Sequence, residues 1–168
     1  EATTVTIPAA GLQALTEGSV TMTADVSDAA GNAAAQVTSS AFTYDKTAPT
    51  ISEFTMNDTA LDADDTATVT IVFSEAVSGF DSGDDVTVVN GSLTTMTSSD
   101  DITWTGTYTP TADTEDSTNV LTLGTSYTDV AGNTGPSATT SNYIVNTKND
   151  PPTAVNDTAT IAEDSGLS

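Results

Sequence analysis

A five-residue motif that occurs twice, far apart in the chain, constrains the fold most. Asp-Ala-Ala-Gly-Asn at residues 28–32 returns as Asp-Val-Ala-Gly-Asn at residues 129–133. Each copy is followed by a stretch rich in Ser, Thr and Ala, then by an aromatic segment, then by a junction that contains proline. Self-similarity at a fixed period indicates tandem modules, here of about one hundred residues each.

The two proline-bearing junctions divide the chain into three parts. Proline cannot donate to a strand ladder, so Pro49 and Pro151 are predicted to follow the last strand of a module. Residues 1–47 are then the C-terminal part of one repeat, residues 48–149 a complete repeat, and residues 150–168 a linker and the start of a following repeat. Two explanations of the incomplete first part stay open: the chain is a fragment, or another copy supplies the missing strands by strand addition.

Alternating apolar and polar residues predict strands in the complete repeat. Residues 67–73 carry apolar side chains at the odd positions, with Thr68 and Thr70 between them, and residues 102–109 alternate in the same way. Further strands are predicted at residues 50–56, 85–89, 119–124 and 137–145 and, in the first part, at residues 4–7, 20–25 and 36–44, with a helical turn at residues 9–15. The predicted fold class is all-β, an immunoglobulin-like antiparallel β-sandwich in tandem repeats, with Trp104 and Tyr108 in its core.

Asn90 and Gly91 predict a tight hairpin within this sandwich. They separate residues 85–89 from residues 92–94, and a type I′ turn requires positive φ at both of its central positions. In the resulting register Val88 lies opposite Leu93.

Three motifs of the complete repeat resemble those of a known family. They are Asp-x-Thr-Ala-Pro at residues 45–49, Phe-Ser-Glu-x-Val at residues 73–77 and Asp-x-Ala-Gly-Asn at residues 129–133. In this order and spacing they resemble the bacterial immunoglobulin-like tandem repeats of large surface adhesins, of the RTX and biofilm-associated type. Residues 150–168 look like the opening of a related cadherin-like repeat. The resemblance implies a secreted, cell-surface protein with modules along a filament and Ca²⁺ at the junctions.

Strand order independently predicts where the carboxylates meet. In an immunoglobulin topology the loops after the second and sixth strands lie at the pole where the chain enters the domain. Those loops hold Glu75 and the pair Asp129 and Asn133, and the entering linker holds Asp45. Close carboxylates repel one another unless a hard cation lies among them, and Ca²⁺ accepts about six to eight oxygen ligands from irregular loops. Ca²⁺ is therefore the predicted cofactor, with Mg²⁺ as the second choice.

The same reasoning extends to the neighbouring junctions. The complete set of predicted metal ligands is Asp45, Glu75, Asp129, Asn133, Asp25, Asp28, Asn32 and Asp150. The alternative is that Asp-x-Ala-Gly-Asn is only a turn, since Asp, Gly and Asn each favour turns for local reasons. The acidic residues at 113–116 are expected to form a solvated loop.

Composition excludes several classes of function. Cys and His are absent, so the chain has no thiol nucleophile, disulfide or histidine general base. With 24 acidic and 2 basic residues, and a net charge of −22, it is not expected to bind nucleic acid or an anionic membrane surface. No apolar run is long enough to insert into a bilayer. Enzymatic activity is not predicted, because a motif that occurs twice fits structure better than catalysis.

The predicted function is that of a structural spacer in a surface adhesin, rigidified by calcium between modules. One alternative is a module that binds a carbohydrate, a protein or ice through the outward row of Thr103, Thr105, Thr107 and Thr109. The other is a fibre subunit assembled by β-strand complementation. The predicted partners are neighbouring repeats of the same chain and, for the fibre, other copies; the ligand on a host or biofilm surface is not identified.

Overall fold

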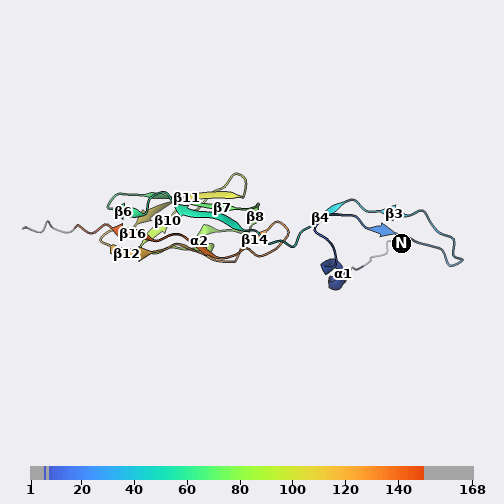
Figure 1. Ribbon diagram of the computed structural model, residues 1–168. Helices are drawn as coiled ribbons and strands as arrows, with labels where there is room; N and C mark the ends of the chain where they lie inside the picture. The colour runs from blue at the N-terminus through green and yellow to red at the C-terminus, as the bar shows by residue number, and fades with distance from the viewer. Residues whose placement is uncertain (1–5, 7, 150–168) are drawn as a thin grey trace, which may run out of the picture.

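The computed structural model describes residue 6 and residues 8–149, which form a β-hairpin with a short helix, a linker and a β-sandwich (Figure 1). The elements of the first part are α1 (Ala9–Gln13), β1 (Gly18–Val20), β2 (Thr23–Ala24), β3 (Val37–Thr38) and β4 (Phe42–Tyr44). β1 pairs with β4 and β2 with β3, both antiparallel, so these strands make one long hairpin. Apart from Thr6, the strand predicted at residues 4–7 lies outside the described residues, as does the segment 150–168.

The sandwich contains the remaining elements. They are β5 (Ile51–Met56), β6 (Ala60–Asp62), β7 (Ala67–Phe73), β8 (Val77–Ser78), α2 (Ser82–Asp85), β9 (Val86–Thr87), β10 (Gly91–Leu93), β11 (Thr103–Pro110), β12 (Glu115–Asn119), β13 (Thr122–Leu123), β14 (Thr128–Asp129), β15 (Ala138–Thr139) and β16 (Tyr143–Asn146). One layer is the four-stranded sheet β10–β11–β7–β5, and the other consists of the shorter sheets β12–β16–β6, β15–β13–β9 and β14–β8. All pairings are antiparallel except that of β16 with β6.

The core lies between the two layers, and the period-two pattern decides which side chains enter it. On β7 the odd residues from Ala67 to Phe73 are buried, whereas Thr68 is exposed on the outer face. Apolar side chains from both layers join one buried cluster, which includes Ile71 and Tyr108 from the large sheet and Leu123 and Tyr143 from the other layer. The prediction of an all-β antiparallel sandwich is confirmed.

The hairpin predicted at Asn90 and Gly91 is wrong. β9 pairs with β13 and β10 pairs with β11, so the chain crosses at this point from one layer to the other. The crossing is held by the hydroxyls of Tyr108 and Tyr143, which both donate to the Val89 carbonyl, at 2.9 and 2.7 Å. Asn90 keeps a positive φ of 52°, but its side-chain amide donates to Asn119 Oδ1 at 2.7 Å instead of closing a hairpin.

The acidic segment at residues 113–116 is also not a loop throughout, because β12 begins at Glu115. Asp116 is half-buried, and its Oδ2 accepts from the Asn90 side-chain amide at 2.9 Å. This carboxylate therefore supports the same crossing between layers and is not merely solvated.

The aromatic pair predicted for the core behaves unequally. Tyr108 is fully buried, whereas Trp104 is half-buried and packs edge-on against Phe80 at 4.9 Å between ring centroids. The Trp104 Nε1–H is buried without a hydrogen-bond partner among the described residues. Trp104 thus covers the rim of the core.

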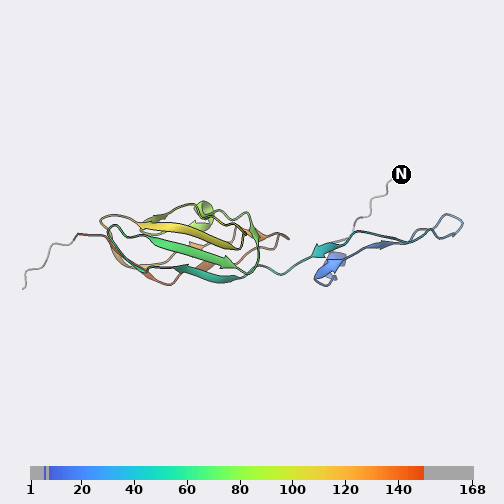
Figure 2. The same ribbon diagram turned by 90° about the horizontal axis from the view of Figure 1, so that it is seen from above.

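Two views show how the two parts are arranged. The hairpin lies beyond the end of the sandwich that carries β8 and β14, and the linker after β4 runs into β5 (Figures 1 and 2). None of the helices in the described part of the chain has the length and hydrophobicity of a membrane-spanning segment.

Candidate metal centre at the linker

The short ladder between β8 and β14 brings two loops together at the end of the sandwich that faces the hairpin. Val77 on β8 is the register partner of Asp129 on β14. Glu75 lies two residues before Val77, in the loop that follows β7, so the pairing sets Glu75 close to Asp129 although the two are far apart in sequence. The sequence places carboxylates in both loops, and the strand pairing makes them neighbours.

Asp45 of the linker joins these two residues. One carboxylate oxygen from each of Asp45, Glu75 and Asp129 lies within 4.8 Å of the other two. Asp45 and Glu75 are half-buried and Asp129 is buried. Two unit charges at such a separation repel by at least about 3.5 kcal/mol at an effective dielectric constant of about 20. Among the described residues, this is the one group of three acidic side chains with this geometry.

Asp129 is held as a carboxylate by its own loop. The Asn133 backbone N–H donates to Asp129 Oδ1 at 2.8 Å, and Asn133 Nδ2 donates to Asp129 Oδ2 at 2.7 Å. Burial raises the pKa of Asp129, but the hydrogen bonds from Asn133, Gly132 and Ala131 outweigh burial and keep the pKa below the ordinary value of 3.8. Asp129 therefore carries a negative charge at neutral pH in a position with almost no solvent exposure.

The pKa of Glu75 is shifted in the opposite direction to that of Asp129. Removal from solvent, and then the negative charges of Asp129 and Asp45, raise the pKa of Glu75 above its ordinary value of 4.5. The cluster thus contains one carboxylate stabilised by hydrogen bonds and one whose ionisation is opposed by its neighbours. A cation among the three oxygens would favour the ionised form of Glu75 and so lower its pKa.

Asn133 also holds the linker. Its side-chain amide lies 3.4 Å from the Asp45 carbonyl and 3.3 Å from the Thr47 carbonyl, to which it donates. Asp45 Oδ1 accepts from the Thr47 N–H at 2.9 Å, which folds the linker into a local turn. Asn133 is therefore a positioning residue that ties the linker to the loop of Asp129.

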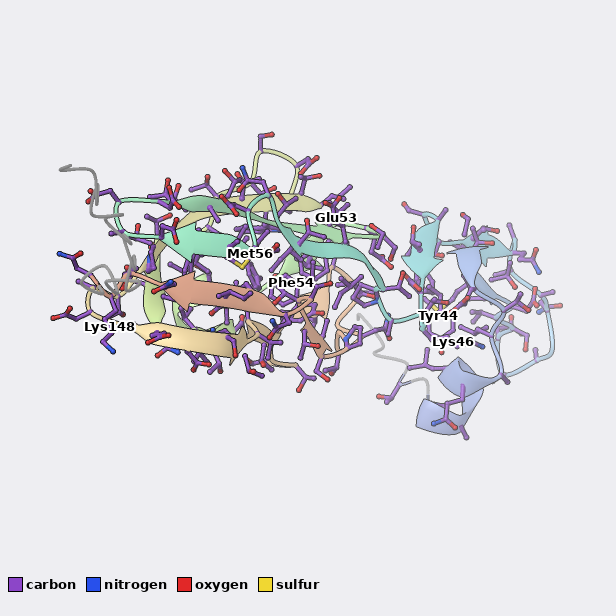
Figure 3. The ribbon with its side chains drawn as sticks, turned by 60° about the vertical axis from the view of Figure 1, so that its left-hand side comes forward. Tyr44, Lys46, Glu53, Phe54, Met56 and Lys148 are labelled. Atoms are coloured by element: carbon purple, nitrogen blue, oxygen red, sulfur yellow. The ribbon has the colours of Figure 1, made fainter. Side chains whose placement is uncertain are left out.

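Glu17, which no sequence motif indicated, holds the linker from the hairpin side. Its carboxylate accepts from the Lys46 N–H at 2.9 Å and from the Thr47 hydroxyl at 2.8 Å. Figure 3 shows Tyr44 and Lys46 at this joint, whereas Lys148 lies at the opposite end of the sandwich. Glu115, the first residue of β12, holds the corresponding position in the sandwich and pairs with Lys148 at 3.5 Å, just after β16.

We expect Thr47→Val to loosen the joint without unfolding the sandwich. The substitution removes the hydroxyl that donates a hydrogen bond to the Glu17 carboxylate, and Thr47 itself is exposed, outside the core. The distribution of distances between spin labels on β3 and β11 should broaden, while the Tm of the sandwich should change by less than about 2 °C. Thr55→Val is the matched control, because Thr55 makes the same kind of bond to Glu53 on β5, away from the linker. Equal broadening in both variants would contradict the assignment.

The first copy of the repeated motif forms the same turn. Asn32 Nδ2 donates to Asp28 Oδ2 at 2.8 Å and the Asn32 N–H donates to Asp28 Oδ1 at 2.9 Å, as Asn133 does to Asp129. Gly31 and Gly132 both adopt positive φ, 87° and 95°. The side-chain hydrogen bond from Asn32 lowers the pKa of Asp28. The turn therefore forms with or without other carboxylates beside it, and the cluster is a feature that only the second copy has among the described residues.

None of the other predicted ligands among the described residues belongs to a group of three acidic side chains. Asp25 Oδ1 accepts from Gln36 Nε2 at 2.9 Å on the exposed hairpin, apart from any group of three carboxylates in the described chain. Asp28 and Asn32 bond to each other, and Asp150 lies outside the described residues. The structure thus brings together four of the eight predicted residues, namely Asp45, Glu75, Asp129 and Asn133.

Comparison with known proteins agrees with this architecture. A family model described as a bacterial Ig-like domain matches residues 45–145, which run from the linker carboxylate to β16. No curated protein and no solved structure matches the chain.

Proposed function

The chain belongs to the bacterial Ig-like domain family, and on this premise we propose that it is a structural extender module of a secreted bacterial cell-surface adhesin, rigidified by calcium at its joints. Ig-like β-sandwich domains are typically non-enzymatic and often stand on the cell surface. The observation that carries the proposal is the meeting of Asp45, Glu75 and Asp129, because one of them belongs to the linker and two belong to the sandwich.

The residues present fit a hard divalent cation. All the candidate ligand atoms are oxygens, from three carboxylates and from the linker carbonyls beside Asn133. A chain without Cys or His has no thiolate or imidazole for a softer metal, and this group of side chains contains no Met. The loops are irregular, which suits the flexible coordination of Ca²⁺ better than the strict octahedron of Mg²⁺. Burial is the larger cause of the raised pKa of Glu75, and neutralising the cluster would remove the second cause, repulsion by Asp129 and Asp45.

An ion at this place would act on the geometry of the joint. Without it, the linker is held to the sandwich by the amide of Asn133 and to the hairpin by Glu17. Ca²⁺ would additionally connect Asp45 to two loops of the sandwich through charged ligands. Because inter-module linkers are mobile by default, this connection would restrict the angle between modules.

Calcium titration of the whole chain tests the proposal. We expect calorimetric binding of Ca²⁺ and, in small-angle scattering, a narrower range of inter-module distances with Ca²⁺ than with EDTA. Mg²⁺ at equal concentration should be less effective. Absence of binding at millimolar Ca²⁺, with unchanged scattering, would contradict the role of calcium.

Glu75→Gln should separate repulsion from metal binding. In EDTA this variant should be at least as stable as the parent, because it removes a charge that faces Asp45 and Asp129. In Ca²⁺ it should bind the ion on the order of tenfold more weakly, since it loses a charged ligand. Lower stability in EDTA, measured by thermal unfolding, would show that Glu75 is not repelled.

The pH dependence follows from the same raised pKa. The pKa of Glu75 is higher in the folded than in the unfolded protein, so the protonated carboxyl favours folding. Its contribution to the free energy of unfolding therefore declines as the pH rises from 4.5 through the folded pKa. A proton on Glu75 competes with the ion, so Ca²⁺ affinity should fall from pH 7 to pH 5. The decline should be smaller in Glu75→Gln, and an equal decline in both proteins would assign the competing proton to another group.

A second candidate function, ligand binding, is supported by the outer face of the large sheet. Thr103, Thr105, Thr107 and Thr109 are all exposed, and Thr68 on β7 is the exposed register partner of Thr107. Such hydroxyl rows are also ordinary on antiparallel sheets that face water. Binding of a polysaccharide that is lost in Thr105→Tyr would favour this function over a spacer.

A further inference from the structure

The hairpin of residues 18–44 repeats the strand pairing of the second half of the sandwich. The Met22 N–H donates to Ser39 Oγ at 2.9 Å, as the Leu121 N–H donates to Thr140 Oγ1 at 3.0 Å. The β2–β3 pairs match the β13–β15 pairs, so Ala24 corresponds to Leu123 and Val37 to Ala138.

The outer ends of the hairpin match in the same way. Phe42 pairs with Val20 as Tyr143 pairs with Asn119. The Ala34 N–H donates to the Val26 carbonyl at 2.7 Å, as the Gly135 N–H donates to the Tyr127 carbonyl at 3.0 Å. The correspondence shifts by two residues between Ala24 and Val26, because the sandwich has two additional residues between Leu123 and Tyr127. It is therefore a correspondence of backbone pairing and not only of sequence.

The corresponding positions differ sharply in burial. Met22, Val26 and Phe42 are 45%, 62% and 37% exposed, whereas Leu121, Tyr127 and Tyr143 are fully buried. In the sandwich these buried residues pack in one cluster with Phe54, Ile71 and Tyr108 of the sheet β10–β11–β7–β5. The hairpin thus carries half of a core whose other half is absent from the described residues. We define this half-core face as Met22, Ala24, Val26, Val37, Phe42 and Tyr44.

We propose that the half-core face binds a four-stranded antiparallel sheet of the β10–β11–β7–β5 kind, carried on the same polypeptide as the first half of an Ig-like repeat. Contiguous exposed apolar surface marks an interaction site, and a two-stranded hairpin is at best marginally stable without a packed face. A sheet is the expected partner because the residues that correspond to the half-core face in the complete repeat pack against such a sheet. The sheet is expected on the same polypeptide because, in the complete repeat, β5–β11 precede β12–β16 in one chain.

An extended chain tests this proposal. A second copy of residues 48–114 is placed directly before Glu17, which corresponds to Glu115 in register. Hydrogen exchange in EDTA is compared with that of the original chain, so that the result does not depend on calcium. Amides of residues 18–44 should exchange at least about tenfold more slowly in the extended chain. Met22→Ser with Phe42→Ser should abolish the gain and leave the complete repeat unchanged.

Two further measurements decide the remaining outcomes. The hairpin has smaller residues at two core positions, Ala24 and Val26, and a larger one at Val37. A second extended chain therefore carries Ala24→Leu, Val26→Tyr and Val37→Ala to restore the volumes of the complete repeat. No gain in protection in either extended chain would overturn the proposal, as would equal protection in the original chain. Sedimentation of the original chain should show a monomer; a dimer that Phe42→Ser dissociates would assign the face to a second copy instead.

Discussion

Asp129→Asn is expected to lose calcium binding and to destabilise the sandwich even in EDTA. The buried carboxylate accepts two hydrogen bonds from Asn133, and an amide at this position turns a donor toward Asn133 Nδ2. Hydrogen bonds to buried charged groups contribute about 1.5 to 3 kcal/mol each, so a net loss of about 2 kcal/mol is expected. For a domain of this size the Tm should fall by roughly 8 to 16 °C.

Glu75→Gln is the control that shows whether the loss of stability comes from the hydrogen bonds of Asp129 or from the loss of a negative charge. Both variants remove one negative charge from the same cluster, but only Asp129 is hydrogen-bonded by its own loop. Thermal unfolding in EDTA should therefore show a large decrease for Asp129→Asn and none for Glu75→Gln. If the two variants behave alike in EDTA, the turn does not depend on the Asp129 carboxylate.

Gly135→Ala is expected to destabilise the sandwich more than Asp129→Asn does. A Cβ at Gly135 would overlap the Tyr127 ring at Cε2 and Cζ. Tyr127 is fully buried, and its hydroxyl donates to the Pro136 carbonyl at 2.7 Å, so the ring cannot move aside freely. Overpacking of this kind is expected to destabilise by about 3 kcal/mol. The Tm should then fall by roughly 12 to 24 °C.

Gly124→Ala is the matched control for this substitution. A Cβ at Gly124 would meet the Asp85 carbonyl at 3.4 Å, an ordinary van der Waals contact. Denaturant unfolding should show little change for this variant. A comparable loss of stability in both variants would mean that the Tyr127 contact is not the cause.

The candidate site was predictable to the extent that it follows from chain topology. Glu75 follows β7 and Asp129 ends β14, two strands that are far apart in sequence but reach the same end of the sandwich, and Asp45 lies in the linker that enters there. Glu17 could not be found in the same way. Its bond to Thr47 spans thirty residues and depends on the β1–β4 pairing, which no local pattern specifies.

The error at Asn90 has the same physical origin. Asn-Gly reports only that the backbone can adopt positive φ, and Asn90 does so. Whether the chain then turns back or crosses to the other layer depends on distant side chains. Here the hydroxyls of Tyr108 and Tyr143 hold the Val89 carbonyl between the layers. A local signal therefore identified the turn but not its connection.

The amino-acid sequence by itself determined the all-β class, the strand faces and the repeated Asp-x-Ala-Gly-Asn turn. These depend on interactions between residues close in the chain: period-two alternation along β7, and the bonds between Asp129 and Asn133 four residues later. Only the tertiary structure decided which of the eight predicted ligands meet, that Glu17 holds the linker, and which apolar face stays uncovered. Those features arise from pairing between segments that are far apart in sequence, and the free energy of such pairing is shared among many contacts.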